Sequence, residues 1–137
     1  MAIPYLACMA LVASLYSLPP RVLPSIHKVE GGAPGTVHRN RDGTDDYGVM
    51  QINSRWLPAL SAYTGLPVEA VRSQLVHRPC FNIAAGGAIL RTYLNETRGD
   101  LMLAIGNYHS HTPMLNRGYQ VKVMRSAASL FTAAGEQ

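Results

Sequence analysis

The sequence predicts a mainly helical protein with a small polar lobe in its middle, and three observations support this fold class. Apolar residues recur at three- and four-residue intervals over most of the chain, as they do on the buried face of a helix. Proline residues and glycine pairs divide these segments from one another. Between residues 33 and 48 the composition changes to Gly, Pro, Asn, Asp, Arg and Thr, which favours a loop or a short polar hairpin.

The N-terminal segment, residues 2–18, is almost uncharged, but its uninterrupted apolar span is short for a bilayer crossing of about 20 residues. No Lys or Arg precedes Arg21, so the basic start of a secretory signal is not visible. We therefore expect no integral membrane segment here. A buried helix is predicted instead, with one core-facing stripe formed by Leu6, Met9, Ala10, Ala13 and Tyr16.

Further helices are expected along the rest of the chain. The second becomes regular near Leu23, with Pro24 in its first turn, and stops at Gly31 and Gly32. Residues 49–60 form an apolar segment that ends near Pro58. The remaining helices are expected at residues 67–75, at 81–94 as the central buried helix, at 101–108 after a cap, and at 119–131.

Length and composition limit the classes of protein that fit. The chain has 137 residues, 47% hydrophobic and 15% charged, which predicts a single domain over residues 1–137 with one core. Its net charge of +4 favours attraction to polyanions, a class that includes nucleic acid, anionic lipid and acidic cell-wall polymers, and charge alone does not choose between them. The basic residues are scattered rather than clustered, which argues against a nucleic-acid-binding protein.

Glu30 is the best single candidate for a catalytic residue. It ends the second helix on its apolar side, one turn after Ile26. The negative end of the helix dipole and burial both disfavour a carboxylate, so the pKa of Glu30 should rise, as a general acid near neutral pH requires. Position alone would favour an exposed Glu at a frayed helix end. The polar lobe that follows favours the catalytic role.

The sequence leaves two questions open: whether the two cysteines form a disulfide, and whether the two nearby histidines bind a metal. Cys8 and Cys80 are far apart and have no metal-ligand spacing. They form either a long-range disulfide, worth about 4 kcal/mol in the chain-entropy treatment, or two buried free thiols. His109 and His111 are spaced like a metal pair but lack a third ligand in a recognisable spacing. We expect no metal and no cofactor.

Several separated motifs then resemble one group of enzymes, in the right order. Residues 40–56 are similar to the corresponding segment of the animal lysozymes. Glu30-Gly31, followed by Gly48-Val49-Met50-Gln51, resembles the motifs of the lysozyme-like lytic transglycosylases. Residues 107–111 and 118–121 occupy the places of that family's later tyrosine motifs, although the two histidines depart from the usual pattern. Cys8 and residues 79–83 look like the small transglycosylases that accompany conjugal-transfer and type IV secretion machines.

The resemblance implies an α+β lysozyme-like fold with a substrate groove between the helical body and the polar lobe. It implies a peptidoglycan lytic transglycosylase that uses Glu30 as acid and then as base, and releases a 1,6-anhydro product. Asp46 matches the second carboxylate of the animal lysozymes, so hydrolysis by Glu30 and Asp46 stays an alternative. Two others are a structural role for Asp46 and a non-catalytic peptidoglycan-binding module.

The resemblance also suggests substrate-binding residues and a setting. The residues expected to bind substrate are Tyr47, Met50, Gln51, Asn53, Asn107, Tyr108 and Tyr119. Trp56 either stacks on a sugar ring or fills the core. The expected location is periplasmic or extracellular, in the bacterial envelope. The expected partners are peptidoglycan strands and components of a type IV secretion, conjugation or pilus system, and not nucleic acid.

Overall fold

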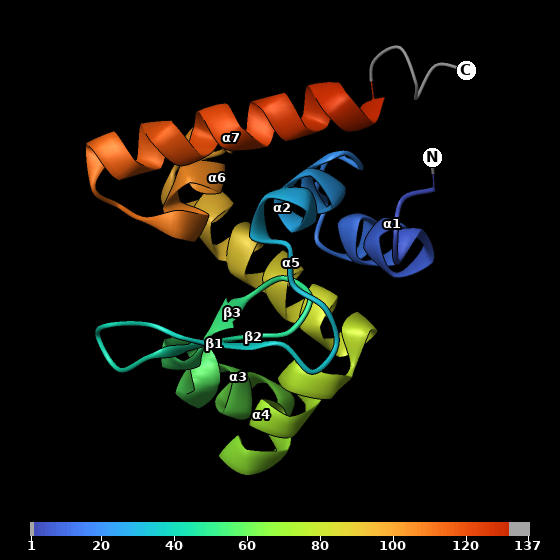
Figure 1. The fold of residues 1–137 in the computed structure, drawn as a ribbon, viewed down its shortest axis with the longest axis vertical. Helices are drawn as coiled ribbons and strands as arrows, with labels where there is room; N and C mark the ends of the chain where they lie inside the picture. Colours follow the sequence, from blue (N-terminus) through green and yellow to red (C-terminus); the bar gives the residue numbers. More distant parts are fainter. Residues whose placement is uncertain (1, 132–137) are drawn as a thin grey trace.

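The computed structural model describes residues 2–131, and within them the protein is mainly helical with one small sheet. The long helix α5 runs through the middle, with α1, α2, α6 and α7 to one side and the sheet with α3 and α4 to the other (Figure 1). This arrangement confirms the predicted fold class. The elements are α1 (Leu6–Leu15), α2 (Val22–Glu30), β1 (Val37–Arg39), β2 (Asp45–Tyr47), β3 (Ile52–Asn53), a 3-10 turn (Ser54–Trp56), α3 (Leu57–Thr64), α4 (Val68–His77), α5 (Pro79–Glu96), α6 (Leu101–His109) and α7 (Pro113–Phe131).

The polar lobe is a three-stranded antiparallel sheet in the order β1-β2-β3. Asp46 in the central strand pairs with His38 on one side and with Asn53 on the other. The turn between β1 and β2 is held by Asp42, whose carboxylate accepts a hydrogen bond from the Thr44 backbone N–H at 2.9 Å. Such short-range bonds are what Asn, Asp and Thr favour in turns, so the predicted polar hairpin forms.

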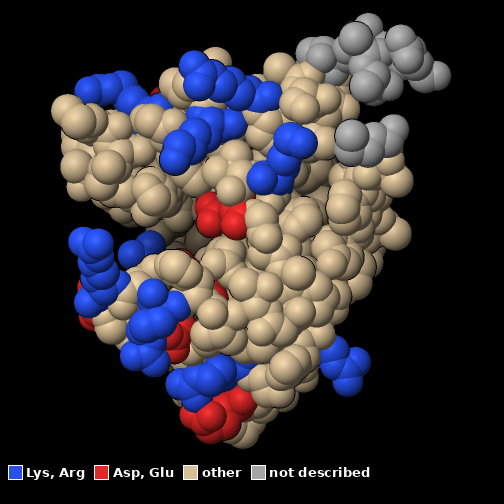
Figure 2. All heavy atoms as spheres, viewed as in Figure 1, with Lys and Arg blue, Asp and Glu red and all other residues tan. Residues whose placement is uncertain are grey.

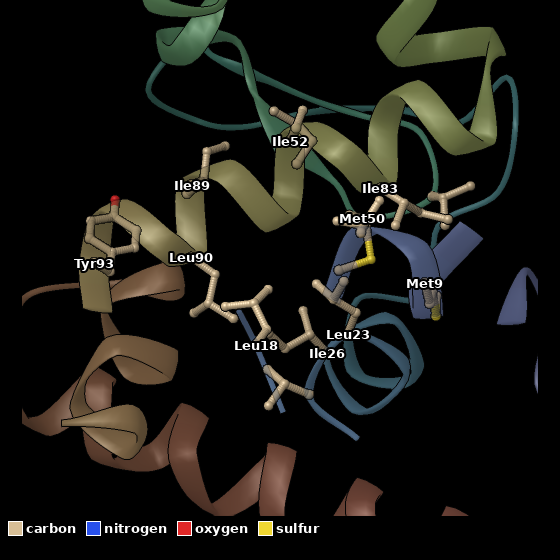
Figure 3. Close-up of a cluster of buried hydrophobic side chains, with 14 of the residues drawn as sticks. Met9, Leu18, Leu23, Ile26, Met50, Ile52, Ile83, Ile89, Leu90 and Tyr93 are labelled. Atoms are coloured by element: carbon tan, nitrogen blue, oxygen red, sulfur yellow. The ribbon is translucent and has the colours of Figure 1, made fainter. Parts of the chain in front are cut away.

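The core is built around α5, to which α1, α2 and the lobe all contribute buried side chains. Figure 3 shows part of this cluster. This helix is longer at both ends than the expected 81–94. At its N-terminal end Pro79 fits the first helical turn, where the missing N–H of proline costs nothing. The labelled members of the cluster are Met9, Leu18, Leu23, Ile26, Met50, Ile52, Ile83, Ile89, Leu90 and Tyr93.

The first helix corrects one expectation. Met9, Val12 and Ala13 face the core, but Leu6 is 51% and Leu11 71% exposed. The expected stripe is therefore wrong at Leu6 and Ala10, which are exposed, and it omits Val12. The segment is apolar on all sides, so its hydrophobic periodicity offers no contrast from which to choose the buried face.

Two other helices also differ from the expectation. Pro58 lies in the first turn of α3, so it starts a helix rather than ending an apolar segment. Helix α7 begins at Pro113 rather than at Tyr119. Asn116 and Gly118 have low helix propensity, but the buried Asn116 side chain donates hydrogen bonds to Asn107 at 2.8 Å and to the Ser110 carbonyl at 3.1 Å. Tertiary bonding thus outweighs propensity.

A disulfide joins Cys8 in α1 to Cys80 in the first turn of α5. Their Cα atoms lie 5.5 Å apart across a sequence separation of 72 residues. Of the two interpretations left open by the sequence, the structure has the disulfide, which attaches the N-terminal helix to the central one. No helix among the described residues is long and apolar enough to cross a membrane.

Candidate active site

A groove of about 470 Å³ separates the helical body from the sheet lobe, within the usual size of a small-molecule site. Figure 2 shows a hollow between these two parts, with acidic atoms at its edge and basic side chains on both sides. The helices contribute Glu30, Ile89, Tyr108 and His109 to its lining. The lobe and the turn after it contribute Asn40, Arg41, Asp42, Thr44, Asp46, Gln51, Ile52, Asn53, Arg55 and Trp56.

Glu30 reaches the groove because α2 ends against the lobe. Gly31 caps the helix with a φ of 70°, a conformation that glycine adopts without strain. A Cβ atom on the next residue, Gly32, would lie 2.0 Å from the Gly48 carbonyl oxygen, so only glycine allows this approach. The two motifs that stand apart in the sequence therefore meet through their backbones, and this contact fixes Glu30 at the boundary between body and lobe.

The surroundings of Glu30 favour the protonated form of its carboxyl group. Burial raises the pKa of the Glu30 carboxyl, the negative charge of Asp46 raises it further, and Tyr119 and Lys122 oppose the rise. The net direction is upward, as the sequence predicts. Its Oε2 accepts a hydrogen bond of 2.5 Å from the Tyr119 hydroxyl. Its other oxygen has no hydrogen-bond partner among the described residues, which leaves Oε1 open to a ligand.

Three aromatic side chains surround this carboxylate. The buried Tyr119 ring stacks with His109 at 5.0 Å and lies nearly parallel to Tyr108 at 6.5 Å. Burial and the nearby Glu30 raise the pKa of the Tyr119 hydroxyl, which therefore stays protonated and acts as a donor. Burial also lowers the pKa of His109, which keeps its imidazole neutral at neutral pH. The helical wall is thus aromatic and uncharged, apart from the carboxyl itself.

Tyr108 connects this wall to the lobe. Its hydroxyl donates a hydrogen bond of 3.0 Å to the Met50 carbonyl oxygen. Burial raises the pKa of Tyr108 well above its ordinary value, so this donor persists over the whole physiological range. The tyrosine both lines the groove and ties α6 to the backbone of the lobe.

The opposite wall is polar and internally bonded. Asp46 accepts a hydrogen bond of 3.0 Å from the Asn53 amide, which also donates to the Thr44 hydroxyl at 3.0 Å. Gln51 has a φ of 52°, which is strained for a residue with a side chain, and its amide nitrogen donates to the Gly48 carbonyl. The Gln51 amide oxygen accepts no hydrogen bond from the described residues, so it remains available to a ligand.

A buried asparagine, which sequence reasoning missed, holds the lobe in place. Asn82 is fully buried on α5, and its amide nitrogen donates to the carbonyl oxygens of Tyr47 at 2.7 Å and Leu75 at 2.8 Å. Its carbonyl oxygen accepts from the Met50 N–H at 2.7 Å. The available signal was a polar residue on the buried face of an otherwise apolar central helix, because such a side chain must find partners inside the protein.

The sequence of this chain matches the Transglycosylase SLT domain family over residues 8–125. It belongs to this family. The match covers the groove, both of its walls and both cysteines of the SLT domain.

Individual relatives are similar at low identity. The chain is 28% identical to the invasion protein IagB of Salmonella typhimurium over 106 residues, 77% of this chain and 62% of that protein. It thus spans less than two thirds of the length of IagB. It is 25% identical to a peptidoglycan-binding-like protein of Escherichia coli O157:H7 over 136 residues, 95% of this chain and 79% of that protein. Lysozyme C of Dromaius novaehollandiae is 70% identical over 20 residues, 15% of this chain and 14% of that protein.

The residues expected to bind substrate divide into those that line the groove of the SLT domain and those that do not. Gln51, Asn53 and Tyr108 line the groove with Glu30 and Asp46, and Tyr119 lies behind Glu30, to which it is bonded. Tyr47, Met50 and Asn107 do not line it and are buried. Apart from Trp56, the groove residues outside the predicted set are Asn40, Arg41, Asp42, Thr44, Ile52, Arg55, Ile89 and His109.

The three predicted residues that do not line the groove have structural partners. Tyr47 neighbours Asp46 on a strand, where successive side chains point to opposite faces, and its hydroxyl accepts from Arg72 at 3.2 Å. Met50 contributes backbone bonds, not its side chain, to the arrangement of the groove. The Asn107 amide donates to Glu96 at 3.2 Å. Direct substrate contact is therefore not assigned to these three side chains.

Trp56 and the histidines complete the SLT site. The Trp56 ring is partly buried, packs edge-on against Tyr93 at 5.9 Å and lines the groove, so it contributes to packing, and stacking on a sugar ring stays a prediction. His111 bonds to Glu96 at 2.6 Å, whereas His109 stacks on Tyr119. Within residues 2–131 no group of three or more His, Cys, Asp or Glu side chains is arranged to hold a metal ion.

Proposed function

We propose that this chain is a peptidoglycan lytic transglycosylase that cuts the β-1,4 bond between N-acetylmuramic acid and N-acetylglucosamine. The observation that carries the proposal is the Glu30 carboxyl: its pKa is raised by burial, one of its oxygens is bonded to Tyr119, and it borders a groove of sugar-binding size. Membership of the transglycosylase SLT domain family supports the same chemistry.

The proposed first step uses Glu30 as a general acid. The protonated carboxyl gives its proton to the glycosidic oxygen, and the bond between that oxygen and C1 of the muramic acid breaks. Positive charge develops at C1 as the leaving sugar departs. The sugar's own N-acetyl group stabilises this charge, so the step needs no second protein carboxylate.

The proposed second step returns the enzyme to its starting state. The ionised Glu30 takes the proton of the 6-hydroxyl, and the 6-oxygen attacks C1 of the same sugar to form the 1,6-anhydro ring. No water is consumed, and the carboxyl ends protonated as it began. Between the two steps the Tyr119 hydroxyl, a donor at 2.5 Å, stabilises the carboxylate.

One alternative has an observation in its favour. Asp46 lines the same groove from the lobe, and its charge acts on Glu30, so the site holds the two carboxylates of a lysozyme-type hydrolase. The short match to lysozyme C supports this possibility. We favour the transglycosylase because the family match extends over both walls of the groove, whereas the lysozyme match covers 20 residues.

The products of digestion test the proposal. Purified protein and its Glu30→Gln variant are incubated with peptidoglycan, and the released fragments are identified by mass spectrometry. We expect 1,6-anhydro-N-acetylmuramic acid ends from the wild type, and a loss of about 10³-fold or more with Glu30→Gln. Glu69→Gln, which changes an exposed carboxylate on α4, is the matched control and should retain activity.

Other products would overturn the proposal. Reducing N-acetylmuramic acid ends would make the protein a hydrolase and give Asp46 the second catalytic role. No release by wild-type protein that still binds the strands would make it a non-catalytic binding module. A thermal unfolding scan of both variants separates loss of chemistry from loss of folding.

We further propose that the protein acts in the bacterial envelope and opens the wall locally for a type IV secretion, conjugation or pilus system. The Cys8–Cys80 disulfide supports a periplasmic or extracellular location, because such bonds persist in oxidising compartments. Thiol labelling under denaturing conditions of protein taken from its native compartment tests this location. Free Cys8 would remove its main support.

A further inference from the structure

A second hollow adjoins the groove and has no part in the proposed chemistry. This side pocket, of about 320 Å³, lies between α1, α3 and α5, and Tyr16, Tyr63, Arg91 and Thr92 contribute to its lining. Trp56 and Ile89 line both the side pocket and the groove. The two hollows therefore adjoin at these side chains, and a ligand that reaches beyond Trp56 from the groove would meet the side pocket.

The side pocket contains a cation that has no acidic partner. The Arg91 guanidinium donates from Nε to the Asn95 side chain at 3.1 Å and from Nη1 to the Tyr16 carbonyl oxygen at 3.3 Å. No ion pair joins it to a carboxylate of residues 2–131. A guanidinium has five N–H donors, so most of them remain available beside this hollow. Two neutral contacts hold the group in place while its charge stays unmatched.

Two tyrosine hydroxyls add donor capacity. The hydroxyl oxygens of Tyr16 and Tyr63 lie 3.1 Å apart, and one hydrogen bond joins them. Burial raises the pKa of Tyr16 to about 12, with a contribution from Tyr63, so its hydroxyl stays neutral at physiological pH. One of the two hydroxyl protons is used between the rings, which leaves the other for a ligand. The side pocket thus offers aromatic surface, hydroxyls and one fixed positive charge.

We infer that the side pocket binds the acidic peptide carried by the glycan strand that lies in the groove. This inference rests on the proposed function, because each N-acetylmuramic acid of peptidoglycan bears a short peptide with free carboxylates. Charge complementarity with Arg91 selects an acidic ligand rather than a neutral sugar. Because Trp56 and Ile89 line both hollows, we expect the ligand of the side pocket to be attached to the strand that lies in the groove. The side pocket is then a specificity site for strands that still carry peptides.

The test compares binding of two soluble strands to the Glu30→Gln protein, which should not consume them. One probe is glycan strands with intact peptides, and the other is the same strands after an amidase has removed the peptides. The sequence contains a single tryptophan, Trp56, whose fluorescence reports binding on both sides of its ring. We expect the peptide-bearing strands to bind about fivefold more tightly.

Two further substitutions in the same protein identify the side pocket as the source of this preference. Arg91→Gln should abolish it, and Arg125→Gln, which removes the same charge from an exposed position on α7, should leave it intact. Ala59→Phe should also abolish it by filling the hollow, whereas Ala62→Phe, exposed on the same helix but outside the hollow, should not.

The outcomes separate this inference from the proposed function. Equal binding of both strands, or a preference that survives Arg91→Gln and Ala59→Phe, would overturn the side-pocket inference and leave the proposed function standing. Failure of both strands to bind would overturn the side-pocket inference and the proposed function together. Loss of the preference in Arg125→Gln as well would show a general charge effect and would also overturn the inference.

Discussion

The two walls of the groove present a carboxylate each, in opposite kinds of surroundings. Glu30, on the helical wall, is bonded to Tyr119 beside stacked aromatic rings, and burial raises its pKa. Asp46, on the sheet wall, accepts a hydrogen bond from Asn53 within a polar network. The two carboxyl groups therefore differ in their surroundings: Glu30 is desolvated beside aromatic rings, whereas Asp46 lies among polar side chains.

The walls also differ in how they are held. The helical wall is supported by side chains packed around α5, and the lobe adds directional contacts to the apolar side chains that it buries in the same core. These contacts are the Gly32–Gly48 backbone approach, the Tyr108 bond to Met50 and the three bonds of Asn82. They align the lobe with the helices at the boundary where the groove lies.

The largest expected effect comes from removing the Asn82 side chain, whose hydrogen bonds connect the lobe to the helices. Asn82→Ala would leave two carbonyls and one N–H without their partner in a buried site, so the free energy of unfolding should fall by about 3 kcal/mol or more. Chemical denaturation measures this change. Asn82→Asp keeps the side-chain size but loses the two donated bonds, and it should be destabilised too. Asn95→Ala, exposed on the same helix, should change stability by less than about 0.5 kcal/mol. An Asn82→Ala protein as stable as the wild type would refute this role.

The next effect comes from the helical wall alone. Tyr119→Phe removes the hydroxyl that donates to Glu30, so strand cleavage should slow by about tenfold. The lost bond also lowers the pKa of Glu30 in the wild type, so its removal should raise that pKa further. The high-pH limb of the rate profile should then move to higher pH. Tyr5→Phe is the control, since Tyr5 lies near His27, away from the groove. An unmoved limb would show that Tyr119 acts only by packing.

A smaller effect is expected from the sheet wall. Asp46→Asn should reduce the rate by no more than about threefold and leave anhydro products, because in the proposed reaction a single carboxyl performs both proton transfers. Removal of its charge should lower the pKa of Glu30, which moves the high-pH limb in the direction opposite to that of Tyr119→Phe. Asp45→Asn, which loses an ion pair with Arg39, is the neighbouring control. A loss of about 10²-fold or more at Asp46 alone would instead support the hydrolase.

The smallest effect concerns stability and pH. Burial raises the pKa of Glu30 in the folded protein, so the folded state binds its proton more tightly than the unfolded state does. The resulting stability is present at low pH and is lost as the pH rises through the raised value. Glu30→Gln should therefore gain stability relative to the wild type as the pH increases, when melting temperatures are compared. Glu69→Gln should show the opposite sign, because its hydrogen bond with Arg72 lowers the pKa of Glu69. A Glu30→Gln difference that does not vary with pH would contradict the desolvation of Glu30.

The groove shows where sequence reasoning succeeds and where it fails. Glu30 was predictable because its helix has a clear apolar face and a glycine stop, both of which are local features. That Tyr47 and Met50 are buried could not be predicted, because a motif names residues without saying which side of the strand or turn each one faces. Asn82 and Arg91 escaped notice because their partners lie on other elements. Such partners become visible only when the chain has folded.

The sequence by itself determined the helical class, the polar hairpin, the family motifs and the position of Glu30 at a helix end, since periodicity, turn chemistry and capping act over a few residues. Only the tertiary structure decided which face of α1 is buried, which residues of the motifs border the groove, and how the lobe is attached to the helices. These outcomes depend on contacts between segments far apart in the chain, such as Tyr119 with Glu30 and Gly32 with Gly48. Desolvation, which sets the chemistry of Glu30, exists only once those segments have packed together.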